Sequence, residues 1–158
     1  MSPDDRRAAI VNATLAVMIR QGIAATTVRD VATEMGTSSG LIHHYFESMD
    51  DVIAAAFEQA ALADLTAVQA GVSQAAHAVE KLERFIASYR SNDGDTTFQL
   101  WLDAWSEATR RPALQRASWQ LNSRWQQMLF GVITAGIDEG TMTCQDPEAA
   151  AWRLLSIL

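Results

Sequence analysis

Between positions 26 and 45, the sequence carries side chains that could read and hold double-stranded DNA. Arg29 can donate two parallel hydrogen bonds to the edge of a guanine in the major groove. Hydroxyl groups, which bind phosphate oxygens, are available on Thr26, Thr27 and Tyr45. The grouping of these residue types within one short stretch indicates recognition of nucleic acid.

Two short helices joined by a tight turn are predicted to position these side chains. Thr27 and Asp30 form a capping box that opens the first helix, and Gly36 supplies the left-handed residue that ends it. Ser38 is expected to cap the second helix, and Ser48 opens a long third one. Two short helices around a glycine-containing turn are typical of a DNA-binding helix-turn-helix.

Ten positions of this stretch follow one pattern, T-x-x-x-[IV]-A-x-x-x-G-x-[ST]-x-G-x-[IL]-x-x-Y-F-x-[ST]. They are Thr27, Val31, Ala32, Gly36, Ser38, Gly40, Ile42, Tyr45, Phe46 and Ser48. In this pattern the chain resembles the TetR family of one-component transcriptional regulators. The segments GLIHHYF and WLDAWSEATRRPAL are similar to its BetI-like branch.

The resemblance implies a DNA-binding domain of three helices over residues 1–50, with the second short helix in the major groove. Leu41 would pack against a thymine methyl group there. The adjacent histidines point in different directions, so a metal pair is not expected. By register with the family pattern, the expected base-edge contacts are Ser38, Ser39, Gly40, Leu41, His43 and His44.

The remaining chain shows helical periodicity throughout, which predicts an all-α fold of about nine helices. The long helix from Ser48 is expected to connect the DNA-binding domain to a helical ligand-binding and dimerisation domain over residues 51–158. The last helix is still apolar at Leu158, which predicts that the sequence stops inside an element.

Aromatic residues mark the candidate effector site. A cluster of such rings can hold a cationic or quaternary ammonium ligand by cation–π attraction, and BetI-like regulators respond to choline. The alternative is that these rings form ordinary core. The resemblance places the effector cavity among the middle helices of the second domain, where the expected walls are Phe85, Tyr89, Phe98, Trp101, Trp105 and Trp125.

Residues 113–139 and 147–158 are predicted to form two helices with a shared apolar surface. A second copy of the chain would bury that surface in a four-helix bundle. Such a homodimer presents two recognition helices about 34 Å apart, or a multiple of that distance, to a palindromic operator. The alternative is that the surface covers the protein's own core.

The charge of the chain opposes non-specific DNA binding. The net charge is −7, and residues 1–51 carry four arginines against seven acidic residues, a net charge of −3. Many family members have a phosphate-binding lysine where this sequence has Met49. An alternative function is therefore a helical interaction or ligand-binding module with weakened DNA binding.

Several classes of protein are not expected. No apolar stretch reaches the length of a membrane span, and the single cysteine, Cys144, favours a reducing cytoplasm. An enzyme could use His77 with Asp103 or Glu107 as an acid–base pair, but no spacing supports it. No cofactor or metal site is expected. The sequence thus predicts a cytoplasmic, homodimeric regulator, more specifically a repressor, released from DNA by a small ligand.

Overall fold

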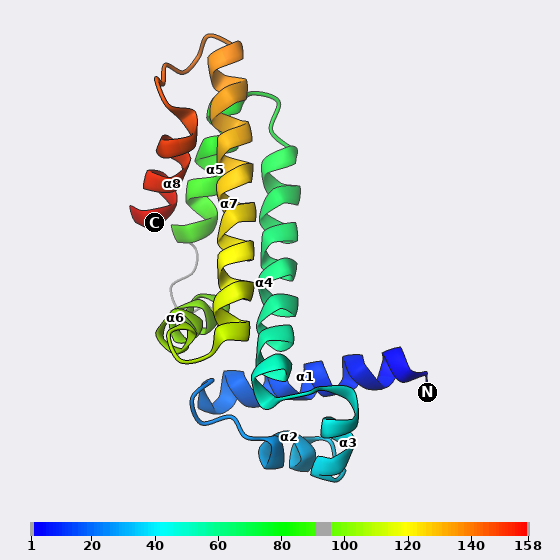
Figure 1. Cartoon of the computed structure of the whole chain (residues 1–158). Coiled ribbons are helices and arrows are strands. Elements are labelled where there is room, and N and C mark those ends of the chain that lie inside the picture. The colour runs from blue at the N-terminus through cyan, green and yellow to red at the C-terminus, as the bar shows by residue number, and fades with distance from the viewer. Residues whose placement is uncertain (1, 91–95, 158) are drawn as a thin grey trace. The chain divides into compact units, whose positions relative to one another are not determined.

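The computed structural model describes residues 2–90 and 96–157, and the predicted chain end at Leu158 lies outside them. The described part is entirely helical, which confirms the all-α prediction, and it holds eight helices where about nine were expected (Figure 1). The helices are α1 (Pro3–Gln21), α2 (Val28–Glu34), α3 (Ser39–Tyr45), α4 (Met49–Ser73), α5 (Ala78–Arg90), α6 (Thr96–Ala108), α7 (Pro112–Asp138) and α8 (Pro147–Ile157).

The chain divides into two compact units. The first contains Met1–Leu62 and Gly94–Trp119, and the second contains Ala63–Asp93 and Gln120–Leu158. Helices α4 and α7 therefore each contribute to both units. The structure groups α6 with the helices of the first unit, whereas a functional boundary at residue 50 remains a prediction.

Local signals in the sequence explain where the first helices begin and end. Ser2 with Asp5 caps α1, and Thr27 with Asp30 caps α2, each through reciprocal side-chain-to-backbone hydrogen bonds. Gly36 has a φ of 62°, which is the left-handed conformation that stops α2. The sequence predicted the capping box of Thr27 with Asp30 and the stop at Gly36.

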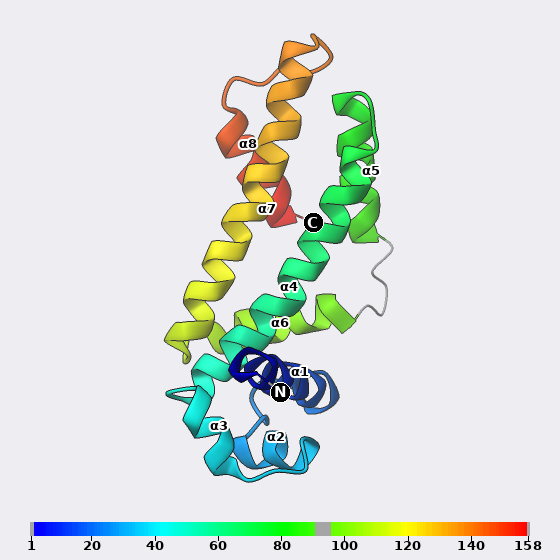
Figure 2. The ribbon, with the colours of Figure 1, turned by 90° about the vertical axis from the view of Figure 1, so that its right-hand side faces the viewer.

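The first unit packs α1, α2, α3 and the start of α4 around shared apolar side chains. Figures 1 and 2 show α2 and α3 lying together on one side of α1. Helix α6 joins the unit through Trp101, whose ring meets Phe57 of α4 edge to face at 4.8 Å. The fully buried residues of this core include Ile10, Val17, Ile23, Val31, Ile53 and Phe57.

The second unit consists of α5, α8 and the adjoining parts of α4 and α7. Two polar contacts connect its elements: the Ala78 amide donates to Glu139 Oε2 at 3.0 Å, and Arg84 Nη1 donates to the Gly71 carbonyl at 3.1 Å. Asp146 caps α8 by accepting from the Ala149 amide at 2.9 Å. Phe85, Leu121 and Leu129 are buried in its core.

Candidate nucleic-acid interface

Helix α3 is fixed to the first unit by its apolar side chains. Ile42 is 1% exposed, and Phe46, which directly follows the helix, is 5% exposed. Both therefore serve as packing residues, as expected for a short helix that cannot be stable alone. With this side buried, the opposite side of α3 faces outward and carries His43 and His44.

The exposed side of α3 carries most of the predicted base-contacting residues. His43 and His44 are exposed on the helix, as are Ser38 and Gly40 at its start, whereas Leu41 is half-buried. Ser39 is also half-buried. The arrangement offers two imidazoles and a hydroxyl to a ligand outside the protein, together with an apolar side chain at the edge of the surface.

Ser38 differs from its predicted role. It occupies the N-cap position of α3 with an extended backbone, but its side chain makes no capping hydrogen bond. The prediction that its hydroxyl caps α3 is therefore wrong. Its exposed hydroxyl remains available to an external hydrogen-bond partner.

The residues around α2 that were predicted to contact DNA phosphates or a guanine fall into two groups. Arg29 is exposed on the first turn of α2, and no described residue pairs with its guanidinium. Thr26 is 4% exposed and donates to the Gly22 carbonyl at 2.7 Å, while the Thr27 hydroxyl donates to Asp30 at 2.6 Å. Both threonine hydroxyls thus stabilise local structure in this state.

Arg7 positions the end of α3, a role that its place in the sequence does not reveal. Its guanidinium lies 3.9 Å from the centre of the Phe46 ring, and its Nη1 donates to the Tyr45 carbonyl at 2.9 Å. It therefore holds the end of α3 against α1 by a cation–π contact and a hydrogen bond. Tyr45 itself is half-buried, with its ring edge-on to His44 at 5.1 Å. No local pattern could reveal a contact that spans 38 positions.

An ion-pair network at the end of α6 is the second feature that the sequence did not reveal. The buried Glu107 carboxylate accepts from Arg110 at 2.5 Å and from Arg111 at 3.3 Å. Arg111 also pairs with Asp50 at 2.5 Å, in the first turn of α4. The hydrogen bonds from Arg110 and Arg111 lower the pKa of Glu107, although burial opposes them. The network joins the segment between α6 and α7 to the start of α4.

The predicted effector-site residues separate between the two units. Phe98, Trp101 and Trp105 lie on α6 of the first unit, with Trp101 buried against Phe57 and Trp105 46% exposed. The other three, Phe85, Tyr89 and Trp125, form a cluster in the second unit.

The cluster of the second unit brings three aromatic rings into mutual contact. The centre of the Tyr89 ring lies 5.3 Å from that of Phe85 and 5.9 Å from that of Trp125. Burial raises the pKa of the Tyr89 hydroxyl, and the nearby Asp64 carboxylate raises it further. Aromatic faces beside a carboxylate are the features that favour an organic cation.

Other chemistries find little support in the described residues. No group of three or more His, Cys, Asp or Glu side chains there is arranged to hold a metal ion. Asp103, considered above as an enzyme's acid, instead accepts a hydrogen bond from the Ile23 amide at 2.5 Å. None of the helices in the described ranges combines the length and apolarity that a membrane span requires.

The geometry of α1, α2 and α3 defines a helix-turn-helix protein, the class that reads DNA with its second short helix. Comparison with family models agrees. Residues 10–56 match the bacterial regulatory proteins of the tetR family, and residues 78–158 match the C-terminal domain of BetI-type transcriptional repressors. The chain therefore belongs to the TetR family, with a C-terminal part of the BetI type. Its relatives are regulators and not enzymes, which removes the acid–base alternative.

Individual relatives support the same assignment. The HTH-type transcriptional regulator BetI of Paraburkholderia xenovorans is 32% identical over 96% of this chain and 74% of its own length. BetI 1 of Chromohalobacter salexigens is 33% identical over 76% of this chain and 60% of its own length. Thus the matched region spans only part of each relative. A regulator from Saccharomonospora viridis, solved in complex with choline, has a TM-score of 0.82 and 26% identity, with 97% of this chain and 81% of that one covered.

Proposed function

We propose that this protein is a repressor that binds a palindromic operator as a homodimer in the cytoplasm and leaves it when a small organic cation binds. The observation that carries the proposal is the outward face of α3. Its buried side is fixed by Ile42 and Phe46, while His43, His44 and the hydroxyl of Ser38 remain exposed. A helix held in this way can enter a major groove without losing the core contacts that support it.

Specific contacts must carry much of the affinity for DNA. Of the arginines near α2 and α3, Arg20 pairs with Glu34 at 3.0 Å and Arg7 stacks on Phe46, whereas Arg29 is unpaired among the described residues. Few positive charges thus remain to bind DNA phosphates. Attraction to phosphates supplies most of the affinity of a protein for non-specific DNA. Base-edge hydrogen bonds from α3 and from Arg29 would provide the discrimination.

Footprinting on the DNA upstream of the protein's own gene tests this proposal. We expect one protected region containing two inverted half-sites, with centres one helical turn or a multiple of it apart. Protection without an inverted repeat would contradict binding as a two-fold dimer. No protection at low salt would favour the alternative, a helical interaction or ligand-binding module with weakened DNA binding. The net negative charge of residues 1–51 and Met49 at the position of the family's phosphate-binding lysine also support that alternative.

We propose the cluster of Phe85, Tyr89 and Trp125 as the effector site, with Asp64 supplying negative charge. The choline complex of the Saccharomonospora viridis regulator supports a quaternary ammonium ligand. Calorimetry with choline and its uncharged isostere 3,3-dimethylbutanol tests this directly. Choline should bind more tightly than the alcohol, because only the cation gains from the ring faces.

Two variants locate the site. Tyr89→Leu should weaken choline binding roughly tenfold, because a contact of this kind is worth about 1–2 kcal/mol. Trp105→Leu changes an exposed ring of the first unit that the sequence also predicts to line the effector site. Weaker binding in Trp105→Leu alone would move the effector site to α6.

The homodimer is proposed from the surface of the second unit. Phe130 of α7 is 39% exposed and Ile157 of α8 is 78% exposed, while Leu154 and Leu155 are half-buried. Apolar side chains on the last two helices favour burial against a second copy. Analytical ultracentrifugation should show a dimer for the wild type and a larger monomer fraction for Phe130→Glu. A wild-type monomer at micromolar concentration would contradict the proposal.

A further inference from the structure

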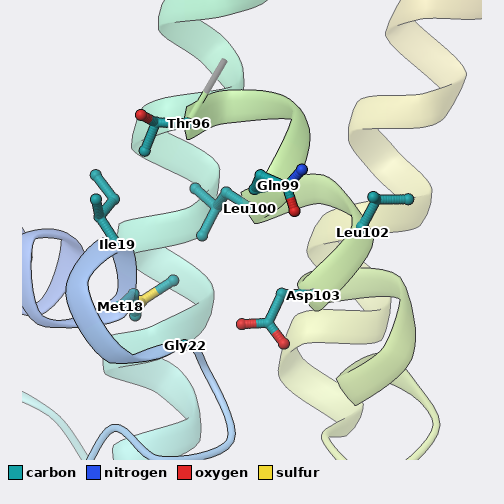
Figure 3. Close-up of a pocket in the computed structure, with 8 residues that line it drawn as sticks. All are labelled: Met18, Ile19, Gly22, Thr96, Gln99, Leu100, Leu102 and Asp103. Atoms are coloured by element: carbon teal, nitrogen blue, oxygen red, sulfur yellow. The ribbon is translucent and has the colours of Figure 1, made fainter. Parts of the chain in front are cut away.

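A pocket lies in the first unit, between α1 and α6, and none of the residues that line it belongs to the aromatic cluster proposed as the effector site. It has a volume of about 500 Å³, which lies within the range of about 300–1,000 Å³ typical of sites for small organic ligands. Figure 3 shows its walls. Those that matter here are Met18, Ile19 and Gly22 from the α1 side and Gln99, Leu100 and Asp103 from α6.

One wall of the pocket is apolar. Met18 is 2% exposed and Leu100 is 5% exposed, so both are anchored in the core, and Figure 3 shows their side chains directed toward one another. Ile19 stands above Met18 with half of its surface exposed. A methionine and two aliphatic side chains offer a flexible surface to a short alkyl chain.

The opposite wall carries a negative charge. Asp103 points toward Gly22 in Figure 3, and its Oδ2 accepts from the Ile23 amide at 2.5 Å. No described Lys or Arg side chain forms an ion pair with Asp103, and no described group donates to its Oδ1. A carboxylate can accept several hydrogen bonds, so Oδ1 retains its capacity for a donor.

We propose that this pocket binds a monovalent amphiphilic organic cation, such as a primary alkylammonium ion. The ammonium group would donate to Asp103 Oδ1, and the alkyl chain would lie along Met18, Leu100 and Ile19. A primary ammonium fits better than a quaternary one, because the carboxylate accepts N–H hydrogen bonds and none of the residues lining the pocket is aromatic. The site therefore differs in ligand class from the aromatic cluster.

The position of Asp103 gives such a ligand a structural effect. Asp103 accepts a hydrogen bond from the backbone amide of Ile23. This amide lies just beyond the end of α1, next to Gly22, whose φ is 86°. A cation at Oδ1 holds the carboxylate in place, so it stabilises the contact between α1 and α6. Binding to the folded state raises the melting temperature as the ligand concentration increases.

Calorimetric titration with hexylammonium and with 1-hexanol tests the proposal. The Asp103→Asn variant keeps an oxygen that can accept from Ile23 but removes the charge. We expect it to bind hexylammonium at least tenfold more weakly than the wild type does, with no difference for 1-hexanol. Equal hexylammonium affinity in both proteins, or no binding by the wild type, would overturn the proposal.

Weaker binding by Asp103→Asn could also arise if the variant were unfolded or if the cation bound elsewhere. Two further variants distinguish these cases from the proposed site. Gln99→Glu adds a second carboxylate at the exposed edge of the pocket and should tighten hexylammonium binding several-fold. Tyr89→Leu alters only the aromatic cluster of the second unit, so Asp103→Asn should weaken hexylammonium binding in the Tyr89→Leu background by as much as it does in the wild type. Weaker hexylammonium binding in Tyr89→Leu, with Gln99→Glu unaffected, would place the cation in the aromatic cluster and overturn the proposal.

Discussion

At the scale of single residues, Glu107 is the buried centre of an ion-pair network in the first unit. It is 4% exposed, yet both carboxylate oxygens are satisfied, one by Arg110 and the other by Arg111. Arg111 extends the network to Asp50. A buried charge is tolerated only when it is paired in this way, so each member depends on the others.

Glu107→Gln should lower the free energy of unfolding by about 3 kcal/mol, because it leaves a mostly buried Arg111 with one carboxylate fewer. Urea denaturation measures this change. Glu80→Gln is the matched control, since the pair of Glu80 with Arg84 on α5 is partly exposed and should contribute less than about 1 kcal/mol. A similar fall in the free energy of unfolding in both variants would show that the burial of Glu107 contributes little to stability.

Glu107 should also make the free energy of unfolding depend on pH. Hydrogen bonds from Arg110 and Arg111 lower the pKa of Glu107 below its ordinary value of 4.5. The unfolded chain therefore binds this proton more readily, and the stabilisation is present above pH 4.5 and lost as the pH falls toward the folded-state pKa. Denaturation measured from pH 6 downward should show a smaller loss in Glu107→Gln than in the wild type. An identical loss in both would contradict this assignment.

At the scale of elements, the turn between α2 and α3 decides where the recognition helix points. Thr27 and Asp30 fix the start of α2, and Gly36 fixes its end. Helix α3 then begins at Ser39 and is held at its far end by Arg7. Each short helix is thus determined at both ends, which compensates for lengths too small for independent stability.

Gly36→Ala should destabilise the protein by about 1 kcal/mol, because a Cβ is unfavourable at a φ of 62°. No atom lies within 4 Å of the position that this Cβ would take, so the effect comes from the backbone alone. Gly71→Ala is the control: it lies in α4 with equally open surroundings, and it should stabilise by up to about 1 kcal/mol. Thermal denaturation that gives both changes the same sign would refute this reading of Gly36.

At the scale of the whole molecule, the net charge of −7 sets the balance between specific and non-specific DNA binding. The net charge alone argues against a nucleic-acid ligand, yet the family assignment and the exposed face of α3 both favour one. A negative net charge is compatible with DNA binding if the affinity for the operator depends on a few well-placed contacts. Exposed Arg29 is the strongest candidate for a cationic one.

The logarithm of operator affinity should therefore fall only shallowly with the logarithm of salt concentration, with a slope no steeper than about −4 for a dimer. Arg29→Ala should make the slope shallower by about 2 if each Arg29 neutralises one phosphate. An unchanged slope with lower affinity would instead indicate that Arg29 reads a base. A wild-type slope near −10 would contradict the expectation of few phosphate contacts.

The elements that the sequence predicted well are those with local signals. The capping box at Thr27, the left-handed glycine at position 36 and the helical periodicity act within one or two turns, and all three appear in the structure. Contacts made by long side chains across the fold were missed, including Arg7 on Phe46 and Arg111 on Asp50. Only the tertiary structure brings such partners together.

The candidate effector site shows the same limit. Aromatic residues at helical spacing were grouped into one set, because spacing alone does not show which helix each ring meets. The structure places Trp101 against Phe57 and brings Tyr89 together with Trp125. The exposed residues of α3 were easier to locate, because the helix-turn-helix is a local motif with a fixed register, while their contact with DNA stays a prediction.

Fluorescence anisotropy with DNA from upstream of the protein's own gene tests the central proposal most directly. Wild type, His43→Ala and His77→Ala should be compared at about 50 mM and about 200 mM salt. His43 lies on the exposed face of α3, and His77 is an exposed histidine of the second unit. We expect sequence-specific binding that His43→Ala weakens at least tenfold, since a good base contact is worth about 1–3 kcal/mol, and that His77→Ala leaves unchanged. Equal binding by all three proteins, or none by the wild type at either salt, would contradict the proposal.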